Sequence, residues 1–319
     1  MRLGILSTAR INRLLLPAAR ESGRVEIAAV ASRDLGRAEA YAREHGFERA
    51  YGSYEELLAD PGLDAVYIPL PNSLHVEWSI RALEAGKHVL CEKPLSRHPE
   101  DAERVFDAAA RAGLVLTEAF MYRHNPQTAR LVELVEGGAI GDLRVVRAAF
   151  SFTITDDANI RLAADLDGGA LMDVGCYCVS GSRLLAGEPS RVFATSVEEA
   201  GVDTVFAATM SFPGGVVAQF DCGFRLPMRD ELEAVGTEGS IFLDDPWHCR
   251  RPVIEIRRDY GVEEIALEPV DSYRLELENL ADAIRGEAAP LLGREDALAQ
   301  ARAIDALYRS AELGEAVSL

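Results

Sequence analysis

Short apolar runs alternate with helix-like stretches over residues 1–120. Uninterrupted apolar runs indicate strands that are buried on both faces, and the spacing between them indicates a helix after each strand. This alternation predicts a doubly wound parallel sheet of the Rossmann type, with right-handed crossovers. The predicted strands are 3–7, 25–32, 65–68, 88–91 and 115–118, and the predicted helices are 12–22, 36–44, a helix capped by Ser53, 76–85 and 98–112.

Beyond residue 122 the pattern changes, because strand-like segments follow one another without intervening helices. Strands in series predict an α+β domain with a large, open, mostly antiparallel sheet. We therefore expect a dinucleotide-binding domain over 1–122 and a substrate-binding and dimerisation domain over 123–319, whose C-terminal helices can pack back on the first. The predicted strands are 143–153, 191–197, 204–211, 216–224, 231–235, 240–243 and 253–257, and the predicted helices are 168–185, 272–285 and 294–312.

Composition narrows the choice of partners. The 319 residues carry a net charge of −19, which disfavours nucleic-acid backbones and anionic membranes as partners. The N-terminus enters a strand without a signal-peptide pattern, and no apolar stretch is long enough to span a bilayer. The five cysteines show no zinc-type spacing, so we expect reduced thiols, no disulfide, no metal and a cytoplasmic protein.

The turn after the first strand is where a dinucleotide fold binds pyrophosphate, against backbone N–H groups at a helix N-terminus. The usual glycine pattern is degraded here, with Ser7, Ala9 and Asn12 at the three glycine positions. The small side chains of Ser7 and Ala9 still permit close approach of a phosphate. The predicted cofactor contacts of this turn are Ser7, Thr8, Ala9, Arg10 and Ile11.

The end of the second strand bears on the choice of cofactor. An NAD site usually places an acid there for the ribose hydroxyls, whereas this chain has Ser32 and Arg33. Arginine pairs well with phosphate and a serine hydroxyl can donate to it, so the pair favours NADP. Asp34 follows immediately and keeps NAD open.

Two further strand ends carry candidate residues at the edge where such sheets place ligands. Leu70, Pro71, Asn72 and His75 follow the 65–68 strand, and Asn72 or Ser73 can alternatively cap the next helix. Glu92, Lys93 and Pro94 follow the 88–91 strand, with the peptide before Pro94 open to either isomer. The predicted cofactor contacts at these two strand ends are Leu70, Pro71, Asn72, His75, Glu92, Lys93 and Pro94. Arg123 is a further predicted cofactor contact, and a domain-closing salt bridge is the alternative for it.

Lys93 stands out because only Lys87 and Lys93 are lysine among 33 basic residues. Arginine replaces lysine well on a solvated surface, but it cannot change its protonation state at a working pH. A lysine kept at a strand end of the predicted sheet is therefore either an amine whose tunable charge is used, which Glu92 can orient, or a chance survivor that forms an ordinary salt bridge. Lys87 has no such context and is expected to be a surface charge.

Asp173 and Tyr177 lie four residues apart in a predicted helix that follows Gly168 and Gly169. At this spacing both side chains share one helix face. An acid near a helix start is also an ordinary dipole partner, and a tyrosine one turn later is often part of a core. The spacing by itself leaves both interpretations open.

Several segments, in this order, resemble the glucose–fructose oxidoreductase/inositol dehydrogenase (Gfo/Idh/MocA) family: the strand–helix start, Glu92-Lys93-Pro94, 118–123 and 168–177. Many members carry a histidine four residues after the aspartate, where this chain has Tyr177. That departure resembles the branch of dimeric dihydrodiol dehydrogenases and NADP-dependent D-xylose 1-dehydrogenases.

The resemblance implies hydride transfer between NADP and a sugar or cyclic polyol, with an aldopyranose oxidised at C1 to a lactone as the first choice. Dihydrodiol, inositol or keto-sugar chemistry, or a non-catalytic NADP sensor, are the alternatives. Tyr177 would be the acid/base group, with Lys93 stabilising phenolate or holding the substrate hydroxyl and Asp173 orienting the sugar. The implied substrate contacts are Tyr122, Asn159, Arg161, Asp173 and Tyr177, and a homodimer through the C-terminal sheet is implied as well.

Overall fold

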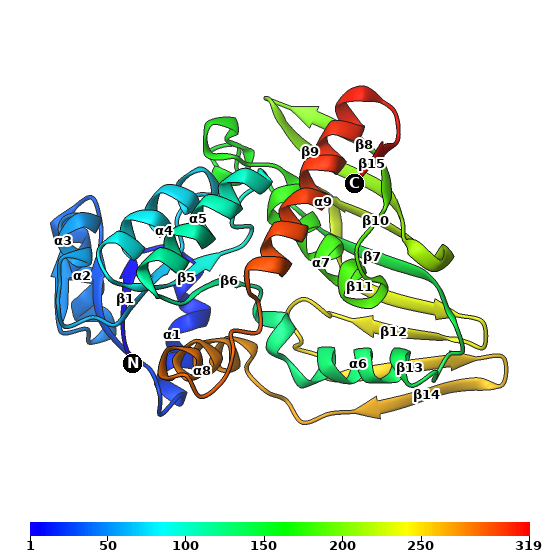
Figure 1. Cartoon of the computed structure of the whole chain (residues 1–319), viewed down its shortest axis with the longest axis horizontal. Coiled ribbons are helices and arrows are strands. Elements are labelled where there is room, and N and C mark those ends of the chain that lie inside the picture. Colours follow the sequence, from blue (N-terminus) through cyan, green and yellow to red (C-terminus); the bar gives the residue numbers. More distant parts are fainter. The chain divides into compact units, whose positions relative to one another are not determined.

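The computed structural model of the chain describes residues 1–319, which form two compact units (Figure 1). The first unit comprises Met1–Ser96, Glu100–Met121 and Tyr273–Leu298. The second comprises Arg97–Pro99, Tyr122–Ser272 and Ala299–Leu319.

The first unit is built on a six-stranded sheet in which every pairing is parallel, in the order β3-β2-β1-β4-β5-β6. This confirms the predicted Rossmann topology. Its strands are β1 (Arg2–Leu6), β2 (Glu26–Ala31), β3 (Arg49–Tyr51), β4 (Ala65–Ile68), β5 (His88–Glu92) and β6 (Leu116–Ala119). Its helices are α1 (Asn12–Glu21), α2 (Leu35–His45), α3 (Tyr54–Leu58), α4 (His75–Glu84), most of α5 (Pro99–Ala112) and α8 (Ser272–Arg285).

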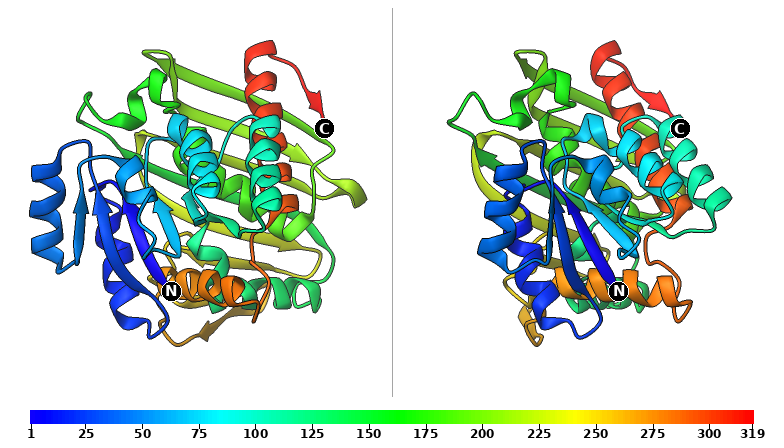
Figure 2. Two further views of the ribbon diagram at one scale, coloured as in Figure 1. Left: turned by 60° about the vertical axis from the view of Figure 1, so that its left-hand side comes forward. Right: turned by 90° about the vertical axis from the view of Figure 1, so that its left-hand side faces the viewer.

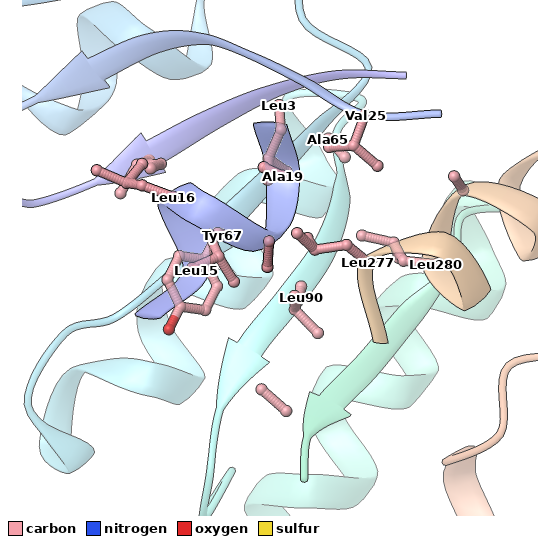
Figure 3. Packing of buried hydrophobic residues seen from close by; sticks show 14 of the residues in the cluster. Leu3, Leu15, Leu16, Ala19, Val25, Ala65, Tyr67, Leu90, Leu277 and Leu280 are labelled. Atoms are coloured by element: carbon pink, nitrogen blue, oxygen red, sulfur yellow. The ribbon is translucent and has the colours of Figure 1, made fainter. Parts of the chain in front are cut away.

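The helix α8 completes the core of this sheet although it lies more than 150 residues after the last strand. Leu277 and Leu280 of α8 pack with Leu15 of α1 and with Tyr67 and Leu90 of the central strands (Figure 3). All five side chains are fully buried. A parallel sheet needs an apolar layer on both faces, and here a distant segment supplies part of one layer.

The second unit contains a nine-stranded sheet in the order β14-β13-β12-β11-β7-β10-β9-β8-β15. Only β7 and β10 pair in parallel, so the sheet is mostly antiparallel as predicted. The strands are β7 (Leu143–Thr153), β8 (Arg191–Glu199), β9 (Val202–Ser211), β10 (Val217–Gly223), β11 (Arg225–Gly236), β12 (Ser240–Asp244), β13 (Val253–Arg258), β14 (Gly261–Ala266) and β15 (Val317–Ser318).

Helices cover one face of this sheet. These are α6 (Pro126–Glu136), α7 (Cys176–Ala186) and the second-unit part of α9 (Arg294–Leu313), which crosses the strands in Figures 1 and 2. Ser310 of α9 accepts a hydrogen bond from the backbone N–H of Ala194 in β8. The opposite face has no helix on it, and its outward side chains surround a hollow of about 710 Å³.

Some elements escaped prediction. The strands β3, β14 and β15 are short or polar, and α6 was missed although Asn125 caps it and Pro126 begins it. The helix predicted over 168–185 is in fact a π-helical turn, Leu171–Gly175, followed by α7. A π turn leaves no mark on hydrophobic spacing, and such turns often occur at functional sites.

Lys87 is not a surface charge, so that prediction was wrong. The residue is 5% exposed, and its ammonium donates to the backbone carbonyls of Asp60 at 2.5 Å and Leu63 at 2.8 Å. Burial lowers the pKa of Lys87, and the Asp60 carboxylate opposes that shift. The lysine therefore satisfies two carbonyl groups of the segment before β4.

The five cysteines are buried, and none of them forms a disulfide. None of the helices combines the length and apolar character that crossing a membrane requires.

Candidate active site

The turn after β1 keeps the backbone shape of a glycine loop without its glycine. Ser7 has φ +135°, a conformation that L-residues rarely adopt. The Asn12 amide donates to the Ser7 carbonyl at 2.9 Å, and the Ser7 hydroxyl donates to the Pro69 carbonyl at 3.2 Å. The helix α1 that follows has no side-chain cap and no acid in its first turn. This helix start therefore fits an anionic group such as a pyrophosphate.

At the end of β2 the structure gives Asp34 a local role. Its carboxylate accepts the backbone N–H of Arg37 at 2.9 Å, which makes Asp34 the N-cap of α2. The Ser32 hydroxyl accepts the Asp34 N–H at 3.3 Å, whereas the Arg33 side chain is exposed. The acid that kept an NAD site open is thus occupied in capping a helix, while the arginine faces solvent.

The loops after β4 and β5 are joined by His75. Its imidazole is fully buried, with one ring nitrogen 2.8 Å from the Pro94 carbonyl and the other 2.8 Å from the Leu70 carbonyl. The helix α4 begins at His75, and its N-cap residue Leu74 makes no side-chain hydrogen bond. The His75 ring fixes the two loops in which the predicted cofactor contacts lie.

Glu92, Lys93 and Pro94 end β5, and the Lys93–Pro94 peptide is cis. The Tyr67 hydroxyl donates to the Glu92 carboxylate at 2.5 Å. Burial raises the pKa of Tyr67 well above 10, and the neighbouring Glu92 carboxylate adds to the shift, so this phenol stays protonated. Glu92 is therefore anchored through Tyr67 to the core of the first unit. Lys93, the next residue in the chain, is partly buried.

In the second unit Asp173 lies in the π turn and forms an ion pair with Arg161, whose Nε lies 2.5 Å from Asp173 Oδ2. Asn159 fixes the loop before it, because its side chain accepts the Arg161 backbone N–H at 3.1 Å. The structure thus brings together Asn159, Arg161 and Asp173, three of the predicted substrate contacts.

Tyr177, in the first turn of α7, is 6% exposed and surrounded by aromatic rings. Ring centroids lie 5.5 Å away for Phe150, 5.8 Å for Tyr122 and 6.0 Å for Trp247. Tyr122 is 1% exposed, and its hydroxyl donates to Ser180 of α7 at 2.7 Å. These contacts restrict the orientation of the Tyr177 ring before any ligand binds.

Trp247 was not foreseen as part of this site. It is fully buried, its indole N–H donates to the Ala149 carbonyl at 3.2 Å, and a methyl group at Gly181 would come within 2.7 Å of its ring. Its position in a loop, away from any motif, gave no signal in the sequence. Only the packing of that loop beneath α7 reveals its role.

A partly buried ionic cluster holds the loop that carries Trp247. Asp230 accepts the Trp247 backbone N–H at 3.2 Å and the His248 ring at 2.7 Å, and Arg250 pairs with Asp245. Burial opposes the charge on His248, but hydrogen bonds to Asp230 and Asp245 raise its pKa to about 9. Two cations thus balance two carboxylates around this loop.

The remaining predicted contacts lie close to these groups in sequence. Thr8, Ala9, Arg10 and Ile11 form the turn before α1, Pro71 precedes the short 3₁₀ turn Asn72–Leu74, and Arg123 lies in another, Met121–His124.

Known families, relatives and solved structures match this chain. The sequence profile described as "Oxidoreductase family, NAD-binding Rossmann fold" matches residues 1–120, and that of the GFO/IDH/MocA C-terminal domain matches residues 128–242. The chain is 43% identical to D-xylose 1-dehydrogenase (NADP(+)) 2 of Haloferax volcanii, covering 100% of both chains.

Two solved structures are also similar. The aldose-aldose oxidoreductase of Caulobacter crescentus, complexed with glycerol, has a TM-score of 0.93 at 28% identity, covering 100% of this chain and 99% of the other. KijD10, a 3-ketoreductase of Actinomadura kijaniata in complex with NADP and TDP-benzene, has a TM-score of 0.92 at 34% identity, covering 97% of each.

Proposed function

The chain belongs to the GFO/IDH/MocA oxidoreductases, whose N-terminal domain is an NAD-binding Rossmann fold, and on that premise we propose that it is an NADP-dependent sugar dehydrogenase. Its proposed reaction is the oxidation of an aldopyranose, such as D-xylose, at C1 to a lactone. The similarity to the Haloferax volcanii enzyme over the whole length supports this choice among the chemistries of the family.

The cofactor is proposed to be NADP rather than NAD. The exposed Arg33 and the hydroxyl of Ser32 would hold the 2′-phosphate, since Asp34 is engaged in capping α2. The turn from Ser7 to Ile11 would hold the pyrophosphate at the start of α1. When bound, the nicotinamide supplies the hydride acceptor.

In the proposed oxidation the phenolate of Tyr177 takes the proton of the C1 hydroxyl, the hydrogen on C1 leaves as hydride to the nicotinamide, and the C1–O bond becomes a carbonyl. A phenol with an ordinary pKa near 10 is a weak base at neutral pH, so it needs a neighbouring positive charge. Lys93 is proposed to supply that charge to Tyr177 or to hold the substrate hydroxyl. Asp173, with its partner Arg161, is proposed to bind a neighbouring hydroxyl of the sugar.

The observation that carries the proposal is the environment of Tyr177. Tyr177 lies four residues after Asp173, three aromatic rings hold its ring, and 6% of the residue stays exposed, so its orientation is fixed as proton transfer requires. The preparation of such a group by rigid packing is what acid/base catalysis requires.

The test is Tyr177→Phe, which removes only the phenol oxygen. We expect it to lower kcat by at least about 100-fold, the usual contribution of one acid/base group, while NADPH still binds. Tyr260→Phe is the matched control, because Tyr260 is 85% exposed on the β13–β14 turn and should keep normal turnover. Near-normal turnover in Tyr177→Phe would refute the proposal.

Substrate choice is tested with a panel of aldoses, inositols, dihydrodiols and keto-sugars, followed by the absorbance of the reduced nicotinamide. A tenfold preference in kcat/KM corresponds to about 1.4 kcal/mol of transition-state binding and identifies the substrate class. Tight NADPH binding without turnover across the panel would instead favour a cofactor sensor.

We further propose a cytoplasmic homodimer formed through the open face of the nine-stranded sheet. The cytoplasmic location is supported by the five buried cysteines, none of which forms a disulfide. That face carries Arg147, Arg229 and Arg257 beside Glu231 and Glu233, so two copies related by a twofold axis can pair opposite charges. Phe193, which is 48% exposed on the same face, supplies an apolar contact.

A further inference from the structure

Hydrogen bonds attach the N-terminal end of the segment that carries Asp173 and Tyr177 to other parts of the second unit. The Gly169 backbone N–H donates to the Arg161 carbonyl at 2.9 Å, and the Leu171 N–H donates to Asp203 Oδ2 at 2.7 Å. Asp203 lies on β9, whereas the segment runs from residue 170 through the π turn into α7. One carboxylate therefore anchors the helical segment on which the proposed acid/base group lies.

Asp203 is 4% exposed and uses both oxygens. Besides Leu171, it accepts the Tyr308 hydroxyl of α9 at 3.1 Å on Oδ1, and the Arg97 guanidinium lies 4.7 Å above the Tyr308 ring. A negative charge at the N-terminus of a helix also interacts favourably with the helix dipole. Asp203 thus connects β9, α9 and the start of the π turn.

The glycine at position 169 is required by this contact. Gly169 has φ +122°, and a β-carbon there would lie 2.2 Å from Asp203 Oδ1. A side chain at position 169 would therefore prevent the backbone of the turn from coming so close to the Asp203 carboxylate.

Keeping the Asp203 carboxylate ionised lowers the stability of the fold. Burial raises the pKa of Asp203 to about 6, and the hydrogen bonds from Leu171 and Tyr308 offset that shift only in part. Because this value lies above that of an unfolded aspartate, near 3.9, the stabilising contribution is fully present below the unfolded pKa and is lost as the pH rises through about 6. A neutral side chain of the same shape would not carry this cost at neutral pH.

We propose that Asp203 is a positioning residue for Tyr177: its carboxylate holds the start of the helical segment in the orientation that the proposed reaction needs. This inference rests on the proposed function. Hydrogen bonds to a charged acceptor are roughly twice as strong as neutral ones, so the charge restrains the π turn more tightly than an amide would. A group that costs stability yet orders a site is typical of selection for function.

Few other charged or titratable groups surround Asp203. Tyr308 from α9, with Arg97 above its ring, and Cys222 from β10 face it, and Glu198 is its exposed partner in β8. Burial raises the pKa of both Tyr308 and Cys222 well above their ordinary values, so neither titrates near pH 6. Burial also raises the pKa of Asp230, which holds the Trp247 loop, so a transition near pH 6 is assigned to Asp203 by its loss in Asp203→Asn.

The test compares Asp203→Asn with the wild type. The amide has the same shape without the charge, so its kcat should fall on the order of tenfold at pH 7.5, while KM for NADP and the thermal midpoint do not worsen. The ratio of wild-type to variant kcat should approach one below pH 6, where wild-type Asp203 is protonated. A ratio near one at pH 7.5, or a ratio that stays near ten at every pH, would overturn the inference.

The control is Asp60→Asn, which alters a buried aspartate of the first unit. Hydrogen bonds from Gly62 and Tyr51 and the charge of Arg49 outweigh burial and lower the pKa of Asp60, so this carboxylate stabilises the fold at neutral pH. Asp60→Asn should therefore lose stability and keep kcat, the reverse of Asp203→Asn. If both variants lose turnover only in proportion to stability, Asp203 is merely structural.

Hydrogen exchange separates this inference from the proposed function, because it needs no substrate. The amides of residues 168–178, corrected for intrinsic rates, should exchange more slowly above pH 6 than below it in the wild type, with no such step in Asp203→Asn. That step without turnover on any sugar would contradict the proposed function alone. Identical exchange in both proteins would contradict the role of Asp203.

Discussion

Replacing Trp247 by phenylalanine tests whether the second-unit core supports Tyr177 in the way the structure indicates. The change removes the indole N–H that donates to the Ala149 carbonyl, a loss of about 0.5–1.5 kcal/mol. It also leaves part of the indole volume empty in a site where Trp247 is fully buried, at roughly 1–2 kcal/mol. We therefore expect Trp247→Phe to lower the free energy of unfolding by about 1.5–3.5 kcal/mol.

The chain offers a matched control, because its other tryptophan is Trp78. Trp78 is 8% exposed, its indole nitrogen has no protein acceptor, and it packs edge-on against Tyr54 with Arg81 over its ring. A phenyl ring retains both contacts, so Trp78→Phe should cost about 1 kcal/mol or less.

Urea unfolding followed by far-ultraviolet circular dichroism compares the two variants. In Trp78→Phe the remaining fluorescence comes from Trp247 alone, which assigns a transition to the second unit if the two units unfold separately. Trp247→Phe should also lower kcat under conditions where the protein is fully folded, because the smaller phenyl ring packs less tightly against Tyr177 than the indole does. Equal stability losses in the two variants, with unchanged kcat, would refute the reasoning.

Three other variants have defined outcomes. Lys93→Arg keeps the charge but not its tunability, so kcat should fall at least about tenfold in steady-state assays, and full activity would contradict a role for a titrating amine. Arg33→Ala should raise KM for NADP roughly tenfold or more while KM for NAD stays within about twofold, since only NADP carries the 2′-phosphate; equal effects on both cofactors would oppose the assignment. Phe193→Asp should shift the protein from dimer to monomer in sedimentation velocity, because it places a charge in the proposed sheet-to-sheet contact, and an unchanged dimer would place the interface elsewhere.

Much of the fold followed from the hydrophobic pattern, because strands buried on both faces and amphipathic helices leave strong periodicities. The predicted helix 272–285 coincides with α8, and the strand 143–153 with β7. Weak periodicity explains the failures: β14 reads GVEEIA, with almost every side chain exposed. Such a strand is defined by its pairing with β13, which its own residues do not encode.

The residues of the candidate site likewise differ in whether the sequence alone could identify them. Residues in short motifs, such as Glu92, Lys93 and the Asp173–Tyr177 pair, could be selected from the sequence, since their chemistry is visible in residue type and spacing. Trp247 and Asp203 could not, because neither lies in a motif and each acts through a neighbour distant in sequence. Asp203 reaches Leu171 across 32 positions, and Trp247 reaches Ala149 across 98.

By itself the sequence determined the class of both sheets, the strand ends at which ligands can bind and the small set of groups with useful chemistry. These properties are local, because they depend on side-chain periodicity and residue type. Only the tertiary structure decided that Lys87 is buried, that Asp34 caps a helix and that a π turn carries Asp173. Those facts depend on which carbonyls, amides and rings the folded chain brings within a few ångströms, and residues near in sequence do not specify that.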